Sequence, residues 1–342
     1  MTDTDRSLVA FVDRRTLAQI LLGFVVAGVV LVLFAVGIGT ENLAAVFSDA
    51  EYRWLVLGCL STALCLVAWG KAWHVVLGVA GIEESFRRLV GTYFAATFAN
   101  YVTPLGQAGG EPFIAYVLSR DTEASYEESL ASVVTADLLN LFPFFSFAAV
   151  GMGWLLWDAS LPAAARPLAM GLLALAVGVP AVTVAGWRFR ERLSSGFLRV
   201  VAPVVRRLPR ATLAGVRERL ADLGSAFDRI ASEPRALVRA LAFSYLGWVF
   251  FALPLYFAGQ TIDLPIGLLL VLFIVPASTV AGIVPSPGGL GGVEAALVAL
   301  LVALTAFTAA EAYAVALVYR VASYWFAIAA GGIATLYVIR RS

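Results

Sequence analysis

The sequence predicts an all-α polytopic membrane protein with six full spans plus two re-entrant broken helical hairpins, arranged as an inverted-topology repeat. Three observations predict this fold class. Of the 342 residues, 61% are hydrophobic and only 14% are charged, far outside the range of soluble domains. Basic residues collect in a few segments between apolar runs. Two of the apolar runs are interrupted by Pro/Gly loops of matching spacing.

Six apolar segments are long enough to cross a bilayer, since a helix needs roughly 20 residues to span a hydrocarbon core about 30 Å thick. The predicted spans cover residues 17–38, 54–79, 128–157, 162–186, 237–258 and 310–338. The first is interpreted as a retained helix rather than a signal peptide, because it is longer than an h-region and ends in no small-residue cleavage site.

The arginines set the predicted orientation. Twelve of them lie between residues 188 and 239, others lie close to both termini, and Arg87 and Arg88 follow the second span. Arg53 and Arg166 fall in loops of the opposite side. Cytoplasmic loops carry the excess of Lys and Arg. Both termini are therefore predicted to be cytoplasmic, in a multi-pass protein of the plasma membrane.

The central loop, residues 187–236, is predicted to be a basic cytoplasmic segment with an amphipathic helix. Apolar residues recur there at helical spacing: Leu213, Val216, Leu220, Leu223, Phe227 and Ile230. With arginines on the same segment, the helix is expected to lie on the inner membrane surface, attracted by anionic lipid at about 1 kcal/mol per basic residue. Nucleic-acid binding is the weaker interpretation, because no aromatic stacking pattern accompanies the charges.

Two further apolar segments, residues 86–119 and 264–307, are broken by Pro/Gly loops. The second arm of the first segment, residues 111–119, gives only about 13 Å of helix, too short to cross. It is therefore predicted to be re-entrant. The second arm of segment 264–307 is longer. The prediction that both ends of this segment lie on the same, external, side of the membrane rests on the placement of the arginines. Non-helical backbone at membrane depth is tolerated where it is buried in protein or lines a wet cavity.

The two loops resemble each other. "PLGQAGGE" ends at Glu111 and "PGGLGGVE" ends at Glu294, and 26 residues after each glutamate stands an ionisable residue, Asp137 or Arg320. Residues 54–157 and 237–338 are thus interpreted as repeats 1 and 2, inserted from opposite faces, which is an architecture of secondary transporters. Chance similarity of two Gly-rich loops is the alternative.

The expected translocation site is polar and lies where the breaks meet. Its loop-forming residues are Pro104, Gly106, Gly109, Gly110, Pro285, Pro287, Gly288, Gly289, Gly291 and Gly292. Asn100 and Gln107 either bind a head group or form hydrogen bonds with the non-helical backbone of the breaks. The same alternatives apply to Tyr93, Tyr101 and Tyr324.

Two alternative roles are considered for each ionisable residue of this site. Glu111 and Glu294 either complement the positive end of their own half-helix or face a cavity and a cationic partner. Arg320, with Glu294 or Glu111 as its counter-ion, either recognises an anionic phosphate or forms a structural ion pair. Asp137 either faces the cavity or has a buried hydrogen-bonded role.

No catalytic residue, metal site or cofactor is expected. His74 is the sole histidine and Lys71 the sole lysine, and both lie near the predicted cytoplasmic end of a span, where interfacial placement of the side chains explains them. The sequence contains no G-x-x-x-x-G-K-[ST] nucleotide motif.

At three segments the chain resembles a known family. "NYVTPLGQAGGEPF", "SLASVVTADLLN" and "VPSPGGLGGVEAALVALLVA" with "AVALVYRVASYW" are similar to the flippase-like membrane domain of lysylphosphatidylglycerol synthases and of the free-standing YbhN or UPF0104 proteins. The resemblance covers nearly the whole chain, without the soluble synthase domain. In that family a basic residue commonly occupies the position of Asp137 and an acid that of Asn140, so a different head-group preference is expected here.

The resemblance implies a lipid flippase that moves a phospholipid, glycolipid or polyprenyl-phosphate lipid between leaflets. Its expected partners are membrane lipids, anionic or phosphate-bearing, with no nucleic acid and with homo-oligomerisation left open. Two other functions stay open: a membrane-embedded lipid or glycolipid transferase, and a non-transporting partner subunit.

Overall fold

The structure, a computed structural model, describes residues 50–103, 110–157, 166–188, 228–284 and 286–341, together with single helical positions between 25 and 37 and between 221 and 225. Most of the predicted span 17–38 and of the central loop 187–236 lies outside the described residues, as does the first Pro/Gly loop, residues 104–109.

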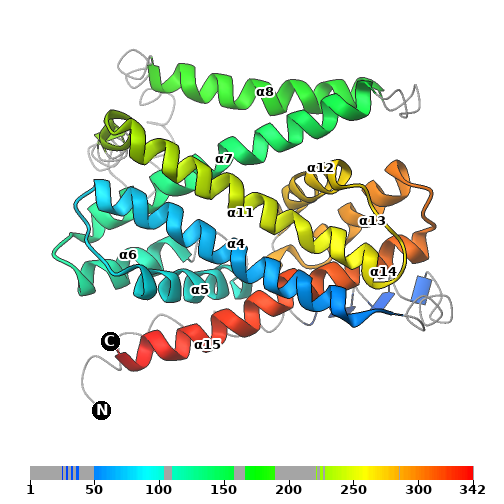
Figure 1. Cartoon of the computed structure of the whole chain (residues 1–342), viewed down its shortest axis with the longest axis horizontal. Coiled ribbons are helices and arrows are strands. Elements are labelled where there is room, and N and C mark those ends of the chain that lie inside the picture. The colour runs from blue at the N-terminus through cyan, green and yellow to red at the C-terminus, as the bar shows by residue number, and fades with distance from the viewer. Residues whose placement is uncertain are drawn as a thin grey trace, which may run out of the picture. The chain divides into compact units, whose positions relative to one another are not determined.

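Every regular element in the described part of the chain is helical (Figure 1), which confirms the all-α prediction. The long helices are α4 (Tyr52–Val79), α5 (Phe86–Val102), α7 (Tyr126–Trp157), α8 (Arg166–Arg188) and α11 (Pro234–Thr261). The shorter elements are α6 (Gly110–Asp121), α12 (Leu268–Thr279), η2 (Val280–Ile283), η3 (Pro287–Gly289), α13 (Gly292–Leu304), α14 (Ala309–Arg320), η4 (Val321–Trp325) and α15 (Phe326–Arg341).

Among the residues that the structure describes, five stretches are long and apolar enough to cross a membrane. Four of them agree with predicted spans and are Tyr52–Val79, Tyr126–Trp157, Pro234–Thr261 and Ala309–Val338. The fifth, Pro287–Leu304, belongs to the second arm of the second predicted hairpin. Helix α8 contains residues 166–186 of the predicted span 162–186, and residues 162–165 lie outside the described residues. The total of six spans and the inverted repeat stay predictions.

Two helices begin at capping boxes that the sequence encodes. At α7 the Ser125 and Glu128 side chains each accept the other residue's backbone N–H, at 3.2 and 3.1 Å. At α14 Thr308 and Glu311 do the same, at 3.3 and 2.7 Å. A capping box satisfies two N–H groups that the helix itself leaves unpaired. The chain therefore restarts as a helix directly after each connecting segment.

The chain divides into two compact units. Unit 1 consists of Met1–Ala63, Phe94–Gly110 and Phe251–Ser342, and unit 2 of Leu64–Tyr93 and Glu111–Phe250. The boundaries fall inside α4, α5 and α11, so both units contain parts of these helices.

In unit 1, α13 packs between α12 and α14 (Figure 1). Helix α15 approaches the second half of α5 so closely that a Cβ on Gly331 would lie 2.5 Å from the Phe94 carbonyl oxygen. The Thr62 hydroxyl of α4 donates to the Ala322 carbonyl of η4 at 2.9 Å. Small residues and backbone hydrogen bonds at contacts are typical of helices packed in lipid.

In unit 2, α7 packs along α8 (Figure 1). Aromatic pairs join the remaining segments: Trp73 of α4 meets Tyr93 of α5 edge to face, and Trp69 meets Trp248 of α11. Such pairs contribute about 0.5–1.5 kcal/mol beyond the area they bury.

Gly331 and its neighbour Gly332 offer a matched test of the α15–α5 contact. We expect Gly331→Ala to destabilise the protein by about 1–3 kcal/mol, because the added methyl group meets backbone that cannot move away. At Gly332 the nearest atom to a Cβ is 3.6 Å away, in the Phe98 ring, so Gly332→Ala should leave stability unchanged or slightly higher. Thermal unfolding of both variants in detergent measures the difference; equal midpoints would contradict this packing.

Candidate functional site

The second Pro/Gly loop breaks the helical backbone, as predicted. Helix α12 ends at Thr279, two short 3-10 turns follow, and α13 begins at Gly292. Gly288, Gly289 and Gly291 have φ of 55°, 66° and 86°. L-residues other than glycine avoid this left-handed region, which explains the glycine-rich composition. Pro285 lies outside the described residues.

The loop closes partly on itself. The Ser286 hydroxyl donates to the Leu290 carbonyl at 2.8 Å, and the Gly289 N–H donates to the Ser286 carbonyl at 3.1 Å. Space is tight, because a Cβ on Gly289 would lie 2.7 Å from the Gly282 Cα, and one on Gly292 would lie 2.7 Å from the Ala281 oxygen. The glycines therefore also allow the loop to pack against η2.

Glu294 lies in the first turn of α13 and is only 2% exposed. Its Oε2 accepts the Gly291 N–H at 2.6 Å. The carboxylate thus satisfies a free N–H group at the positive end of its helix. The capping interpretation of Glu294 is confirmed.

Arg320, the last residue of α14, is the counter-ion of Glu294. Its Nε donates to Glu294 Oε1 at 2.6 Å, and its Nη2 donates to the Gly288 carbonyl oxygen at 3.0 Å. Arg320 is 8% exposed, so both charges of the pair are buried. One guanidinium therefore neutralises the carboxylate and also satisfies a carbonyl group of the broken backbone.

Tyr324 covers the guanidinium. Arg320 Cζ lies 4.2 Å from the centre of the Tyr324 ring, a cation–π contact. The Tyr324 hydroxyl lies within donating distance of two carbonyl oxygens, that of Pro287 at 3.3 Å and that of Tyr101 at 3.2 Å. The rings of Tyr101 and Tyr324 are 5.2 Å apart, and Leu290 packs with them. Of the two readings of Tyr324, the satisfaction of unwound backbone is therefore confirmed.

Tyr101 connects this cluster to the first predicted hairpin. It lies near the end of α5, three residues before Pro104, where the first Pro/Gly loop begins. Within unit 1, the end of the first arm of one broken segment thus contacts the loop of the other. Asn100 is half-buried on the same turn of α5. Gly110 begins α6, whereas Pro104, Gly106, Gln107 and Gly109 lie outside the described residues.

A π-helical turn, η4, directly follows Arg320. π turns inside α-helices are frequent at functional sites. This one lies inside the predicted span 310–338, and the span therefore contains a local irregularity that the sequence did not reveal. The Thr62 contact with Ala322 holds one of its carbonyl groups.

Glu111 and Asp137 belong to unit 2. Glu111 is half-buried in the first turn of α6, and Asp137 on α7 accepts the Trp73 indole N–H at 3.1 Å. The two carboxyl groups are close enough to interact electrostatically. The hydrogen-bonded reading of Asp137 is thus confirmed.

Asn140, one turn further along α7, is held by α11. Its side-chain oxygen accepts the Ser244 hydroxyl, and its carbonyl oxygen accepts the Trp248 indole N–H at 3.1 Å.

Comparisons with known proteins match the chain over most of its length. The family model described as "Lysylphosphatidylglycerol synthase TM region" matches residues 20–331. A UPF0104 membrane protein of Pyrococcus horikoshii is 25% identical over 323 residues, which cover 91% of this chain and 95% of the relative. A UPF0104 membrane protein of Methanothermobacter thermautotrophicus is 25% identical over 307 residues, covering 87% and 89%.

Glu294→Gln isolates the charge of the buried pair. The amide can still accept the Gly291 N–H, but Arg320 loses its counter-ion, and breaking a buried pair costs about 3–5 kcal/mol. Thermal or denaturant unfolding in detergent measures the loss. Glu311→Gln is the matched control, since Glu311 also accepts an N–H of its own helix start but is only half-buried and forms no ion pair with a described arginine; it should change stability by less than about 0.5 kcal/mol. Equal effects of the two variants would mean that capping, not the ion pair, is the role of Glu294.

Gly288→Ala tests the backbone of the break. A Cβ there would lie 2.0 Å from Tyr324 Cε2, in a ring held by its hydroxyl contacts, and φ is positive. We expect a loss of more than about 2 kcal/mol from strain and overpacking together. Gly267→Ala is the control, because nothing lies within 4 Å of its Cβ position and its φ is −62°. A thermal midpoint of Gly288→Ala equal to that of the control would contradict the described loop.

Proposed function

The chain belongs to the lysylphosphatidylglycerol synthase TM region family, and from this premise we propose that it moves a phosphate-bearing membrane lipid between leaflets through a polar cavity at the broken helices. The lipid is a phospholipid, glycolipid or polyprenyl-phosphate lipid. Its head group contacts Arg320 and Glu294 while its chains stay in the bilayer.

The observation that carries this proposal is the buried Glu294–Arg320 pair at the break of an apolar segment. An acid or an arginine at the bilayer centre is unfavourable by roughly 2.5–3.5 kcal/mol on insertion scales. Capping of an exposed helix end contributes only about 0.3–1 kcal/mol, which does not offset that cost. Ionisable groups at this depth occur mostly at the pathways of substrates and ions.

Arg320 suits a phosphate ligand. The guanidinium has five N–H donors in a planar fork that matches phosphate, and its described hydrogen bonds use two of them. A head-group phosphate entering beside Glu294 is therefore expected to compete for the same cation. Protonation of Glu294 would lower the cost of this exchange, which makes the glutamate the candidate coupling group for transport that is downhill or proton-coupled.

The contact of Tyr101 with Tyr324 supports a site formed by both broken segments. In the proposal, the segment 86–119 enters from the cytoplasm and the segment 264–307 from outside, as inverted repeats, with both termini cytoplasmic. Transporters with such repeats bind substrate where the broken elements meet and work by rocking one repeat against the other. The expectation that Glu111 and Asp137, which belong to unit 2, also contact the head group stays a prediction.

The test is lipid movement in vesicles that contain the full chain and a fluorescent phosphate-bearing lipid, whose arrival in the outer leaflet is followed by chemical quenching. We expect wild-type protein to exceed protein-free vesicles. Arg320→Gln should slow movement by about tenfold or more, because the cation that binds the phosphate is lost, and 1.4 kcal/mol of binding already corresponds to a factor of ten. Glu294→Gln imitates the protonated carboxyl, so it should change the rate and remove its dependence on pH.

Two further variants keep the result interpretable. Arg320→Lys retains the charge but loses the planar fork, so it should fold and still transport slowly. Glu311→Gln should transport within about twofold of wild type, because this helix cap lies outside the proposed site. Wild-type rates equal to those of empty vesicles, or unchanged rates in folded Glu294→Gln protein, would overturn the proposal.

A further inference from the structure

The buried charge at the break in unit 1 consists of one carboxylate and one guanidinium. Glu294 is 2% exposed and Arg320 is 8% exposed, and no other charged residue in the described part of unit 1 is buried. The neighbouring elements α12, η2 and η3 contain no ionisable side chain. The closed pair is therefore neutral, and an incoming anion meets a single cation.

The other ionisable groups at this site are phenols. Tyr324 covers the guanidinium at 4.2 Å, Tyr101 packs on Tyr324, and Tyr313 of α14 lies close enough to Glu294 to interact with it electrostatically. The ordinary pKa of a tyrosine is about 10, so these side chains add no charge between pH 5 and pH 8. The charge of an occupied site is thus set by Arg320, Glu294 and the ligand.

Arg320 presents only part of its surface to a phosphate. Its Nε donates to Glu294, its Nη2 donates to the Gly288 carbonyl oxygen, and the Tyr324 ring covers one face of the guanidinium plane. The other N–H donors are on the two Nη atoms. Whether a phosphate uses these donors or takes the place of Glu294, it meets one positive charge, and a second negative charge on the phosphate has no partner in the pair.

Phosphate esters differ in the charge that they bring. A phosphodiester has one negative charge, whereas a phosphomonoester has about −1.5 to −2 at pH 7, because its second pKa is about 6. If Glu294 is protonated when the lipid binds, a diester and Arg320 neutralise each other, and a doubly charged monoester leaves one negative charge unbalanced. If Glu294 stays ionised, each ester leaves one more. The diester is therefore the better ligand in both cases, since unbalanced buried charge is costly.

We propose that the Arg320 site selects lipids whose phosphate is a diester, and that a phosphomonoester lipid binds there only after it has taken up a proton. This inference rests on the proposed function and narrows its lipid to one class. The class contains phospholipids with an esterified head group and sugars that are linked to a polyprenol through a phosphodiester. Lipids that end in a free phosphate are disfavoured at neutral pH.

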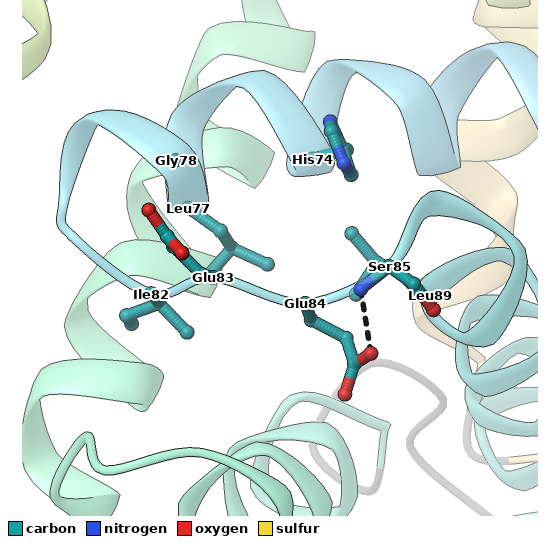
Figure 2. Close-up of a pocket in the computed structure, with 8 residues that line it drawn as sticks. All are labelled: His74, Leu77, Gly78, Ile82, Glu83, Glu84, Ser85 and Leu89. Atoms are coloured by element: carbon teal, nitrogen blue, oxygen red, sulfur yellow. Dashed lines mark hydrogen bonds between the residues drawn. The ribbon is translucent and has the colours of Figure 1, made fainter.

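The cavity of about 410 Å³ at the turn between α4 and α5, in unit 2, does not suit a phosphate (Figure 2). Its ionisable lining residues are Glu83, Glu84 and His74, so two carboxylates disfavour an anion there. His74 is the sole histidine of the chain, and a histidine ordinarily titrates near pH 6.5, close to the second pKa of a phosphomonoester. His74→Gln is therefore the control for a pH effect that arises in the protein instead of in the ligand.

Two soluble probes that differ by one methyl group isolate the charge: dihexanoylphosphatidic acid, a monoester, and dihexanoylphosphatidylmethanol, a diester. The Kd of each for the full chain in a non-ionic detergent is measured by isothermal titration at pH 5 and at pH 8. With a second pKa of about 6, only about one monoester in a hundred has a single charge at pH 8, so we expect the monoester to bind about a hundredfold more weakly than the diester there, and within about threefold at pH 5. Titration of Glu294 affects both probes and cancels in the ratio of the two Kd values.

Two variants assign the effect to the site. Arg320→Lys keeps a single positive charge, so it should weaken the binding of both probes but keep their ratio at pH 8. His74→Gln should bind both probes as wild type does. Failure of both probes to bind wild type at either pH would overturn the proposed function together with this inference. Equal binding of the two probes at pH 8, or a ratio that no longer depends on pH in His74→Gln, would overturn this inference alone.

Discussion

The backbone between Thr279 and Gly292 forms only two short 3-10 turns instead of a continuous α-helix. Carbonyl groups that these turns leave without a partner find none in lipid, so side chains of the protein must supply one. Arg320 and Tyr324 do so together. The guanidinium binds the Gly288 carbonyl, and the phenol lies within donating distance of the Pro287 carbonyl. Glu294 then balances the charge of Arg320 and caps α13. The break, the ion pair and the start of the following helix are therefore one interdependent arrangement.

This arrangement explains why both roles weighed for Glu294 are present at once. One carboxylate oxygen accepts the Gly291 N–H and the other accepts Arg320, so capping and ion pairing do not compete. The same ion pair is also the proposed binding site for a phosphate. In the proposed function, a head-group phosphate replaces one of these partners of Arg320, and the adjacent π turn is a point where the helix is already irregular.

Much of this site was predictable because charge in an apolar segment is conspicuous. The Pro/Gly loop, Glu294 and Arg320 were identified from composition and spacing alone, and the need for a counter-ion left Glu294 or Glu111 as the partner of Arg320. The carbonyl partners in Gly288, Pro287 and Tyr101 were not predictable, since they depend on the path of the backbone and leave no side-chain signal. The π turn and the cavity beside His74 were missed for the same reason, as both arise from packing rather than from a motif.

The most direct test of the central claim is a cryo-EM structure of the full chain in lipid nanodiscs at a resolution that shows lipid head groups. The account predicts density for a phosphate within hydrogen-bonding distance of the Arg320 guanidinium, beside Glu294, with acyl chains leading to the bilayer. A closed Glu294–Arg320 pair surrounded only by protein side chains and acyl chains, with no polar density next to it, would contradict the account.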